Sequence, residues 1–143
     1  MRFIVLFYML LGLMAASAFA ETGSLIVPAR YLIGVPFTND SSEPNTIHFS
    51  ATGRWSWRFG EITTPAGESN SCQIYGMCPM NRKNIGGLIV RHRTRYRYVG
   101  NSIQLNLRGG ETVYFLMNDA AYSYKDNEGF VEINWTKLPS AMP

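Results

Sequence analysis

The feature that most constrains the fold of this chain is a period of two in its apolar residues. In Thr46–Thr52, the apolar Ile47, Phe49 and Ala51 alternate with polar residues, and Ser102–Leu107 alternates in the same way. This spacing places the apolar side chains on one face of a β-strand. No segment after residue 20 has a sustained helical period. About eight short strands with turn signals between them therefore predict an all-β, antiparallel β-sandwich or jelly roll.

Four longer segments add detail to the expected sandwich. Thr112–Met117 is almost continuously apolar, which indicates a central, buried strand. Leu88–Val99 is interpreted as one long strand. Glu61–Asn84 has no period and contains Gly, Pro, Ser, Asn and both cysteines, so it is expected to be one long surface loop. Asn118–Gly129 is a polar loop between two apolar strands.

Residues 1–20 have the pattern of a secretory signal peptide. Arg2 provides a positive start, an apolar run follows, and Ala18-Phe19-Ala20 provides the small residues that signal peptidase recognises. The apolar run is too short for a membrane-spanning helix, which needs roughly 20 residues. We therefore expect an exported protein, periplasmic or secreted, with no membrane span, whose mature part, residues 21–143, is a single domain.

The two cysteines, Cys72 and Cys78, both lie in the mature part. An exported protein meets an oxidising compartment, so a disulfide between them is expected. The disulfide would close a short ring, so it would stabilise the fold by only about 2 kcal/mol. Its main effect would be to fix the surrounding loop. Two cysteines without a nearby histidine do not make a zinc site.

Charge and composition argue against several classes of function. The chain has 13 Lys and Arg against 10 Asp and Glu, so removal of Arg2 leaves a net charge of about +2. This excess is too small to indicate a nucleic-acid partner. The clustered carboxylates Asp119, Asp126 and Glu128 leave glycoside hydrolysis as an enzymatic alternative. A small sandwich lacks the deep cleft for that reaction, so we expect a protein that is not an enzyme.

The loop Asn118–Gly129 carries oxygen donors at both of its ends. Asp119 lies at one end, and Asp126 and Asn127 lie at the other. Calcium takes about six to eight oxygen ligands from carboxylates, amides and carbonyls, so these residues predict a calcium site. An ordinary acidic turn uses the same residue types and is the alternative interpretation of this loop.

Several segments of the chain resemble the PA-I type galactophilic lectins, which are calcium-dependent bacterial lectins within the galactose-binding-like β-sandwiches. Thr46–Trp57 is similar to the strand that leads to the family's first calcium ligand, and the cysteine pair falls where those lectins have one. The other matching segments are Gly87–Val90, Val99–Gly100, Gly110–Asp119 and Asp126–Ile133. The resemblance covers most of residues 45–135. It implies a lectin with calcium as its cofactor, a carbohydrate as its partner and a homo-oligomeric assembly.

The resemblance also implies metal ligands, position by position. Asp119 matches the family's carboxylate ligand, and Ser123 matches a residue that binds calcium through its carbonyl. Trp57 falls where the family uses a tyrosine carbonyl. Asp126 replaces an asparagine ligand, which keeps an oxygen and adds a negative charge. Asn127 matches an amide that contacts both the metal and the sugar.

In those lectins, the calcium ion chelates two vicinal hydroxyls of galactose. The resemblance therefore implies five sugar-binding residues in this chain: Asp119, Ala120, Asp126, Asn127 and Gln73. The family uses a His and a Gln of the cysteine loop to hold the primary hydroxyl. This loop has no His, so the sequence departs from the pattern that selects galactose. A calcium ion that only clamps two loops is the structural alternative.

Arginines at every second position are the other unusual feature of the sequence. On one strand, Arg91, Arg93, Arg95 and Arg97 would share a face. Such a face suits an anionic partner, for example an acidic glycan, a lipopolysaccharide phosphate or an acidic protein surface. An edge strand whose charges prevent sheet-to-sheet aggregation is the alternative. A periplasmic protein-binding module, of the inhibitor or immunity type, is the second hypothesis for the function of the chain.

Overall fold

The computed structural model describes residues 20–69, 72 and 77–138. Residues 1–19 of the expected signal peptide and Gln73 lie outside the described residues. The described chain contains a short 3-10 turn, η1 (Tyr124–Asp126), and no helix in it is long and apolar enough to cross a membrane. Its nine strands are β1 (Thr22–Pro28), β2 (Val35–Thr38), β3 (Asn45–Arg58), β4 (Glu61–Thr63), β5 (Leu88–His92), β6 (Arg95–Tyr98), β7 (Ser102–Leu107), β8 (Thr112–Met117) and β9 (Glu128–Lys137).

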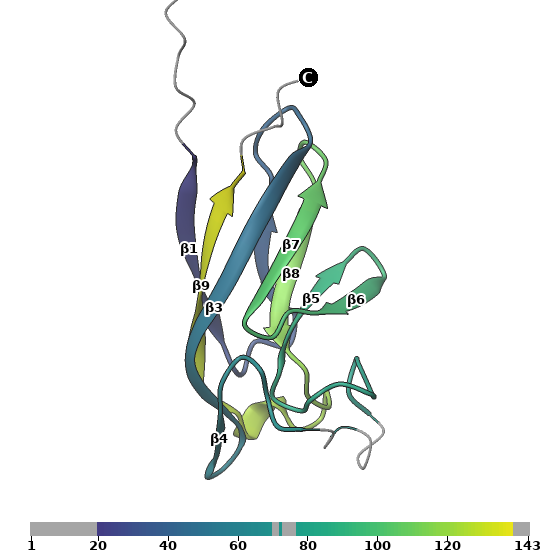
Figure 1. Ribbon diagram of the computed structural model, residues 1–143. Coiled ribbons are helices and arrows are strands. Elements are labelled where there is room, and N and C mark those ends of the chain that lie inside the picture. Colours follow the sequence, from purple (N-terminus) through teal and green to yellow (C-terminus); the bar gives the residue numbers. More distant parts are fainter. Residues whose placement is uncertain (1–19, 70–71, 73–76, 139–143) are drawn as a thin grey trace, which may run out of the picture.

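The strands form two antiparallel sheets that pack against each other (Figure 1). In the first sheet the order is β1-β9-β3-β4, and β7 pairs with the N-terminal part of β3. The second sheet has the order β2-β8-β5-β6. This architecture confirms the predicted all-β sandwich, and the position of β8 between two neighbours confirms that Thr112–Met117 is a central strand.

The core lies between the two sheets and is rich in aromatic rings. The predicted inward faces of β3 and β7 are buried, as their period of two requires. Phe49 of β3 joins the sheets, because its ring centroid lies 5.0 Å from that of Phe37 in β2 and 4.9 Å from that of Phe115 in β8. Trp135 of β9 adds an edge contact to Phe37 at 5.2 Å. These rings hold the two sheets face to face.

The prediction of one surface loop over Glu61–Asn84 is wrong at the start of that segment. Residues 61–63 form β4, which pairs with the end of β3 as a hairpin. Further along, Glu68 bridges to Ile85, and Cys72 and Cys78 are buried. The described part of this segment is therefore attached to the end of the sandwich through a few buried residues, while many of its other residues are exposed.

The predicted single strand over Leu88–Val99 is wrong, because the chain turns back at Arg93 and Thr94. The two halves form the hairpin of β5 and β6, in which Arg91 lies opposite Tyr96. Residues directly opposite each other in an antiparallel pair point to the same face of the sheet. The hairpin therefore places the arginines on faces of the sheet that differ from those expected for a single strand.

The turn of this hairpin is stabilised by contacts from outside it. Arg93 adopts a left-handed conformation with φ of 57°. The Glu111 carboxylate accepts hydrogen bonds from the Arg93 guanidinium at 2.8 Å and from His92 Nε2 at 2.7 Å. Two-residue hairpin turns favour Gly or Asn, and Arg93-Thr94 contains neither. The local residues therefore carry no turn signal that an analysis of the sequence could use.

We predict that Phe49→Ala lowers the free energy of unfolding by about 3–5 kcal/mol, because it opens a cavity among the rings that join the sheets. Urea unfolding of the oxidised protein, followed by tryptophan fluorescence, measures this loss. Phe59→Ala is the matched control, since the Phe59 side chain is 87% exposed, and a change within about 0.5 kcal/mol is expected for it. Equal effects of the two variants would contradict this description of the core.

Candidate functional site

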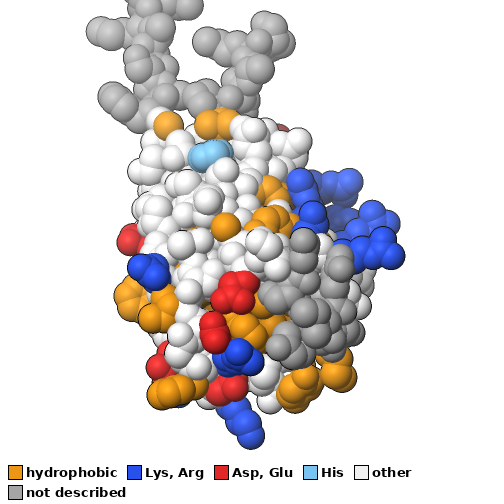
Figure 2. All heavy atoms as spheres, turned by 60° about the horizontal axis from the view of Figure 1, so that its bottom comes forward, with side chains coloured by type: hydrophobic (Ala, Val, Ile, Leu, Met, Phe, Trp, Pro, Cys, Tyr) orange, Lys and Arg blue, Asp and Glu red, His pale blue; other side chains and the backbone are white. Residues whose placement is uncertain are grey.

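The candidate site lies at the end of the sandwich where the β8–β9 loop, residues 118–127, meets the end of β3. The pairing of β3 with β9 places Ser56 opposite Glu128, which brings the loop beside Trp57. The loop, β4 and η1 all lie at the lower end of the molecule in Figure 1, and Figure 2 shows acidic and hydrophobic side chains together at this end. A hollow of about 160 Å³ opens here, and it is lined by Trp57, Arg58, Ile85, Asp119, Ala120, Tyr122, Ser123 and Asp126. Five of the residues that the sequence singled out therefore line one hollow.

Asp119 is the buried carboxylate of this hollow, with a side chain only 1% exposed. Its Oδ1 accepts hydrogen bonds from the Ala120 backbone N–H at 2.7 Å and from the Ser123 hydroxyl at 3.0 Å. Its Oδ2 is fully buried and has no hydrogen-bond partner among the described residues. Burial raises the pKa of Asp119, whereas the neighbouring Asn127 side chain, the Ala120 N–H and the Ser123 hydroxyl act to lower it. The charge of Asp126 adds a smaller rise.

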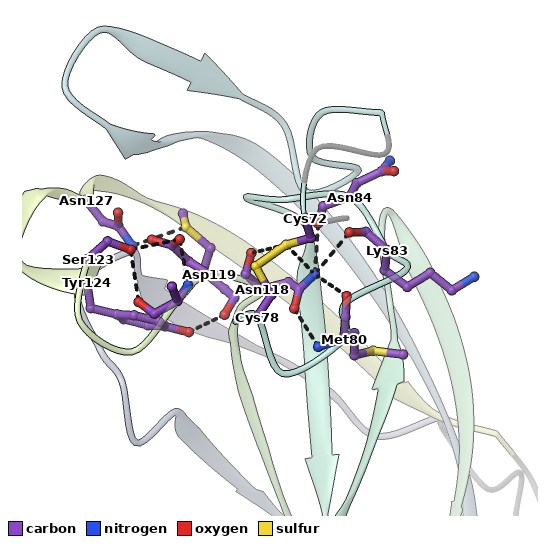
Figure 3. The surroundings of a disulfide bond; sticks show 12 residues. Cys72, Cys78, Met80, Lys83, Asn84, Asn118, Asp119, Ser123, Tyr124 and Asn127 are labelled. Carbon is purple, nitrogen blue, oxygen red and sulfur yellow. Dashed lines mark hydrogen bonds between the residues drawn. A yellow bond between two sulfur atoms is a disulfide. The ribbon is translucent and has the colours of Figure 1, made fainter. Parts of the chain in front are cut away.

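Asn127 is a second fully buried polar side chain, at the other end of the loop. Its amide nitrogen donates to the carbonyl of Ala29 at 3.3 Å and to the sulfur of Met117 at 3.4 Å. Its Oδ1 is buried without a hydrogen-bond partner among the described residues. In Figure 3, the side chains of Asp119, Ser123 and Asn127 lie next to one another. Two unsatisfied oxygens thus lie in the same small region.

The 3-10 turn fixes the chain between these two residues. The Tyr124 hydroxyl donates a hydrogen bond to the carbonyl of Met117 at the end of β8. Burial raises the pKa of Tyr124, and the Asp119 carboxylate adds to this shift. The carbonyl of Ser123 accepts from the N–H of Asp126 at 3.1 Å, and the Asp126 side chain is exposed. The loop therefore has a buried, rigid base and one carboxylate at its rim.

The donors of this site fit a hard cation. An unpaired oxygen that is buried costs free energy unless a ligand satisfies it, and Asp119 and Asn127 each hold one. Carboxylate and amide oxygens are ligands that calcium takes, and backbone carbonyls complete such shells. No group of three or more His, Cys, Asp and Glu side chains that could hold a metal occurs in the part of the chain that the structure describes. A cation here would therefore depend on amide and carbonyl oxygens as much as on carboxylates.

The predicted disulfide between Cys72 and Cys78 is present and lies against the start of the same loop. Asn118 connects the two, as Figure 3 shows. Its Oδ1 accepts from the N–H of Met80 at 3.0 Å, and its amide nitrogen donates to the carbonyls of Met80 and Asn84 at 3.1 Å each. The fully buried Asn118 thus forms hydrogen bonds that water would otherwise make to the backbone of the cysteine segment, residues 61–84.

This role of Asn118 was not predicted from the sequence. The residue follows a buried apolar strand directly, which was the available signal. An asparagine at that position looks like the first residue of an ordinary polar loop. Its partners lie more than 30 positions earlier in the chain, so only the tertiary structure brings them within hydrogen-bond distance.

The four arginines do not form the single face that the sequence predicts. The hairpin puts Arg91 on the face of Tyr96, and its guanidinium lies 4.7 Å from the centre of the Tyr114 ring. Arg95 and Arg97 lie on the opposite face of the hairpin, since they are the neighbours of Tyr96 along β6. Arg93 sits in the turn and is bound to Glu111. The expectation of four parallel arginines is wrong because a turn divides the segment.

Comparison with known proteins supports the fold of this chain. No protein-family model matches the sequence, and no curated protein matches it. Among solved structures, the chain is similar to one described as "EclA N-terminal domain; PllA-like lectin", with a TM-score of 0.59 and 19% identity. The match covers 80% of this chain and 95% of that one. The chain has a lectin-like fold. At this identity the likeness concerns the fold alone, so the chemistry of the lectin-like sandwich has to be argued from its own residues.

We predict that Asn118→Ala lowers the free energy of unfolding by about 2–4 kcal/mol, because it leaves buried backbone groups of the cysteine segment unpaired. It should also speed proteolysis within residues 61–84 and reduction of the disulfide by dithiothreitol. Asn101→Ala is the control, because Asn101 is exposed in a turn. If the two variants unfold and are cleaved alike, Asn118 does not anchor the segment.

The Glu111 contacts predict a specific pH dependence. Hydrogen bonds from the Arg108 backbone N–H and from His92 and Arg93 lower the pKa of Glu111 from 4.5 to about 2. Since the folded pKa is depressed, the stabilisation is complete above pH 4.5 and is lost as the pH falls toward about 2. The stability difference between wild type and Glu111→Gln should therefore shrink over this window in urea unfolding. The control is Glu43→Gln, because the Glu43 side chain is exposed and its carboxylate forms no ion pair among the described residues. A result for Glu111→Gln that does not change over this window would contradict the assignment.

Proposed function

We propose that this chain is a carbohydrate-binding, lectin-like protein that holds its sugar through a calcium ion in the β8–β9 loop. The observation that carries the proposal is the pair of buried, unsatisfied oxygens, Asp119 Oδ2 and Asn127 Oδ1. The lectin-like fold supports the same proposal, because the paired loops at this end of the sandwich provide the site. Buried polar oxygens are normally paired, so two of them at one loop favour a ligand over an ordinary acidic turn.

The residues of the hollow have separate roles in this proposal. Asp119 and Asn127 are the side-chain ligands, and Trp57 and Ser123 are proposed to bind through their backbone carbonyls. Asp126 is exposed at the rim, where it could serve as a further ligand and accept hydrogen bonds from sugar hydroxyls. When bound, calcium supplies coordination sites at which sugar hydroxyls replace water.

The electrostatics of the loop agree with a bound cation. Burial works against the charged form of Asp119, which is why its pKa is raised in the protein alone. A divalent cation beside the carboxylate favours the charged form and compensates for that burial. Removal of calcium should therefore loosen the loop, and addition should raise the thermal midpoint, because a ligand that binds only the folded state stabilises it.

The class of sugar follows from the size and lining of the hollow. A space of about 160 Å³ admits part of one hexose rather than an oligosaccharide. Ala120, on the floor, and the partly exposed Tyr122, at the rim, leave room for a ring that approaches through two neighbouring hydroxyls. We propose a neutral hexose with a vicinal diol, and galactose as the first candidate.

The test is calorimetric titration of calcium into EDTA-treated protein, followed by galactose, mannose and glucose. Asp119→Asn keeps the shape of the side chain but removes the charge, and we expect it to weaken calcium binding by about tenfold or more. Glu43→Gln is the matched control, an exposed carboxylate outside the site, and it should leave the affinity unchanged. Sugar heat should appear only when calcium is present.

Two results would count against the proposal. If titration of calcium into the wild-type protein gives no heat of binding, the proposed metal site is wrong, and the similarity to lectins concerns the fold alone. If calcium gives a heat of binding but none of the three sugars does, the calcium ion has only a structural role and clamps the loops. That second result would favour the protein-binding module as the function.

A further inference from the structure

The edge strand β6 carries two exposed arginines without acidic partners. Arg95 and Arg97 are both exposed, and neither side chain forms an ion pair or hydrogen bond among the described residues. Arg91 and Arg93 differ, because one stacks on Tyr114 and the other binds Glu111. Figure 2 shows Lys and Arg side chains gathered at one edge of the molecule. The unpaired pair is therefore the part of the arginine segment that is free to bind a ligand.

The two arginines border a hollow that is separate from the candidate calcium site. Its volume is about 660 Å³, and none of its lining residues belongs to the hollow at Asp119. Arg95 and Arg97 are two positions apart on the edge strand β6, so their Cα atoms are roughly 7 Å apart. The lining residues are His92, Arg93, Thr94, Arg95, Tyr96 and Arg97.

The hairpin is held rigidly at both of its ends. At its base, the Tyr98 hydroxyl donates to the carbonyl of Ala66, and the Lys83 ammonium lies 5.6 Å from the centre of the Tyr98 ring. At its turn, the Glu111 carboxylate binds Arg93 and His92. A rigid hairpin loses little conformational entropy when it binds a ligand. This favours a ligand-binding role for the arginines over a role that only prevents aggregation at the sheet edge.

The acidic group beside the hollow does not cancel its charge. Glu111 already accepts from the N–H of Arg108 as well as from His92 and Arg93. The Glu111 carboxylate is therefore engaged by these three donors, and it forms no ion pair with Arg95 or Arg97 among the described residues. Guanidinium groups form paired, charge-assisted hydrogen bonds with phosphate and sulfate oxygens, and unpaired guanidinium groups are suited to that role.

We propose that this hollow is a second binding site, which takes the sulfate or phosphate groups of an anionic saccharide. The volume lies within the range of small-molecule sites and admits a short saccharide. The Thr94 hydroxyl and the polar side chains of the lining provide partners for sugar hydroxyls. The spacing of the two arginines matches charges carried on a chain better than a single compact ion. The site does not depend on calcium and stands apart from the function proposed above.

A saccharide fits this hollow better than a membrane surface does. Binding to an anionic membrane usually combines basic residues with exposed aliphatic or aromatic side chains that enter the lipid. No residue of the lining is aliphatic, and Tyr96 is half-buried. The hollow is also concave, whereas a lipid surface is flat. The chemistry therefore favours an oxyanion on a soluble sugar chain.

The test measures binding of sulfated maltotetraose to the whole protein in EDTA, with unmodified maltotetraose as the neutral probe. We expect binding of the sulfated sugar alone, weakened by added salt. Arg95→Ser with Arg97→Ser should weaken it by about tenfold or more, since each change removes charge-assisted hydrogen bonds. The conservative Arg95→Lys with Arg97→Lys should give a smaller loss, because lysine keeps the charge but not the fork of donors.

A charge-matched control separates a site from the net charge of the protein. Arg54 is an exposed arginine on β3, in the other sheet, and we expect Arg54→Ser to change the affinity by less than about twofold. The charge-matched partner of this control is Arg97→Ser alone, which should weaken binding by more than about twofold. The proposal is overturned if Arg54→Ser weakens binding as much as Arg97→Ser does, or if the neutral sugar binds equally well. Binding to phosphatidylglycerol vesicles without binding to the sulfated sugar would overturn it in favour of a membrane. Because the assay is run in EDTA, failure of the calcium site does not affect its outcome.

Discussion

The pairing of β3 with β9 is the constraint on which the rest of the molecule depends. The ladder runs from Ile47 opposite Lys137 to Ser56 opposite Glu128, and it fixes where β9 begins. The segment before β9 must therefore return beside the end of β3, which is where the candidate site forms. A slip of one residue would turn the buried face of β9 to solvent, so the core enforces this register.

A glycine and an asparagine complete the positioning of the site. Gly129, opposite Trp55, has φ of 81°, and a Cβ there would lie 3.2 Å from the carbonyl oxygen of Arg54. The chain can enter β9 at this angle only because the residue has no side chain. On the other side, Asn118 binds the cysteine segment to the end of β8. The loop between them is thus fixed at both ends, which allows buried polar oxygens to be held without partners from the protein.

The molecule separates its two unusual concentrations of polar groups. Unsatisfied oxygens lie at the loop end, and unpaired guanidinium groups lie on the edge hairpin of the second sheet. Glu111 forms an ion pair with Arg93 at the hairpin turn, and the Arg91 guanidinium stacks on the Tyr114 ring. The buried carboxylate and amide oxygens therefore lie at one hollow, and the two unpaired guanidinium groups lie at the other.

The sequence by itself determined the class of fold, because the alternation of Ile47, Phe49 and Ala51 is a local property that the core then satisfies. It also determined the disulfide and brought Asp119, Ser123 and Asp126 into one loop. Only the tertiary structure decided that Asn118 anchors the cysteine segment and that the arginines divide between two faces. Those outcomes depend on a turn without turn residues and on partners far along the chain, and interactions over such separations leave no period or motif in the sequence.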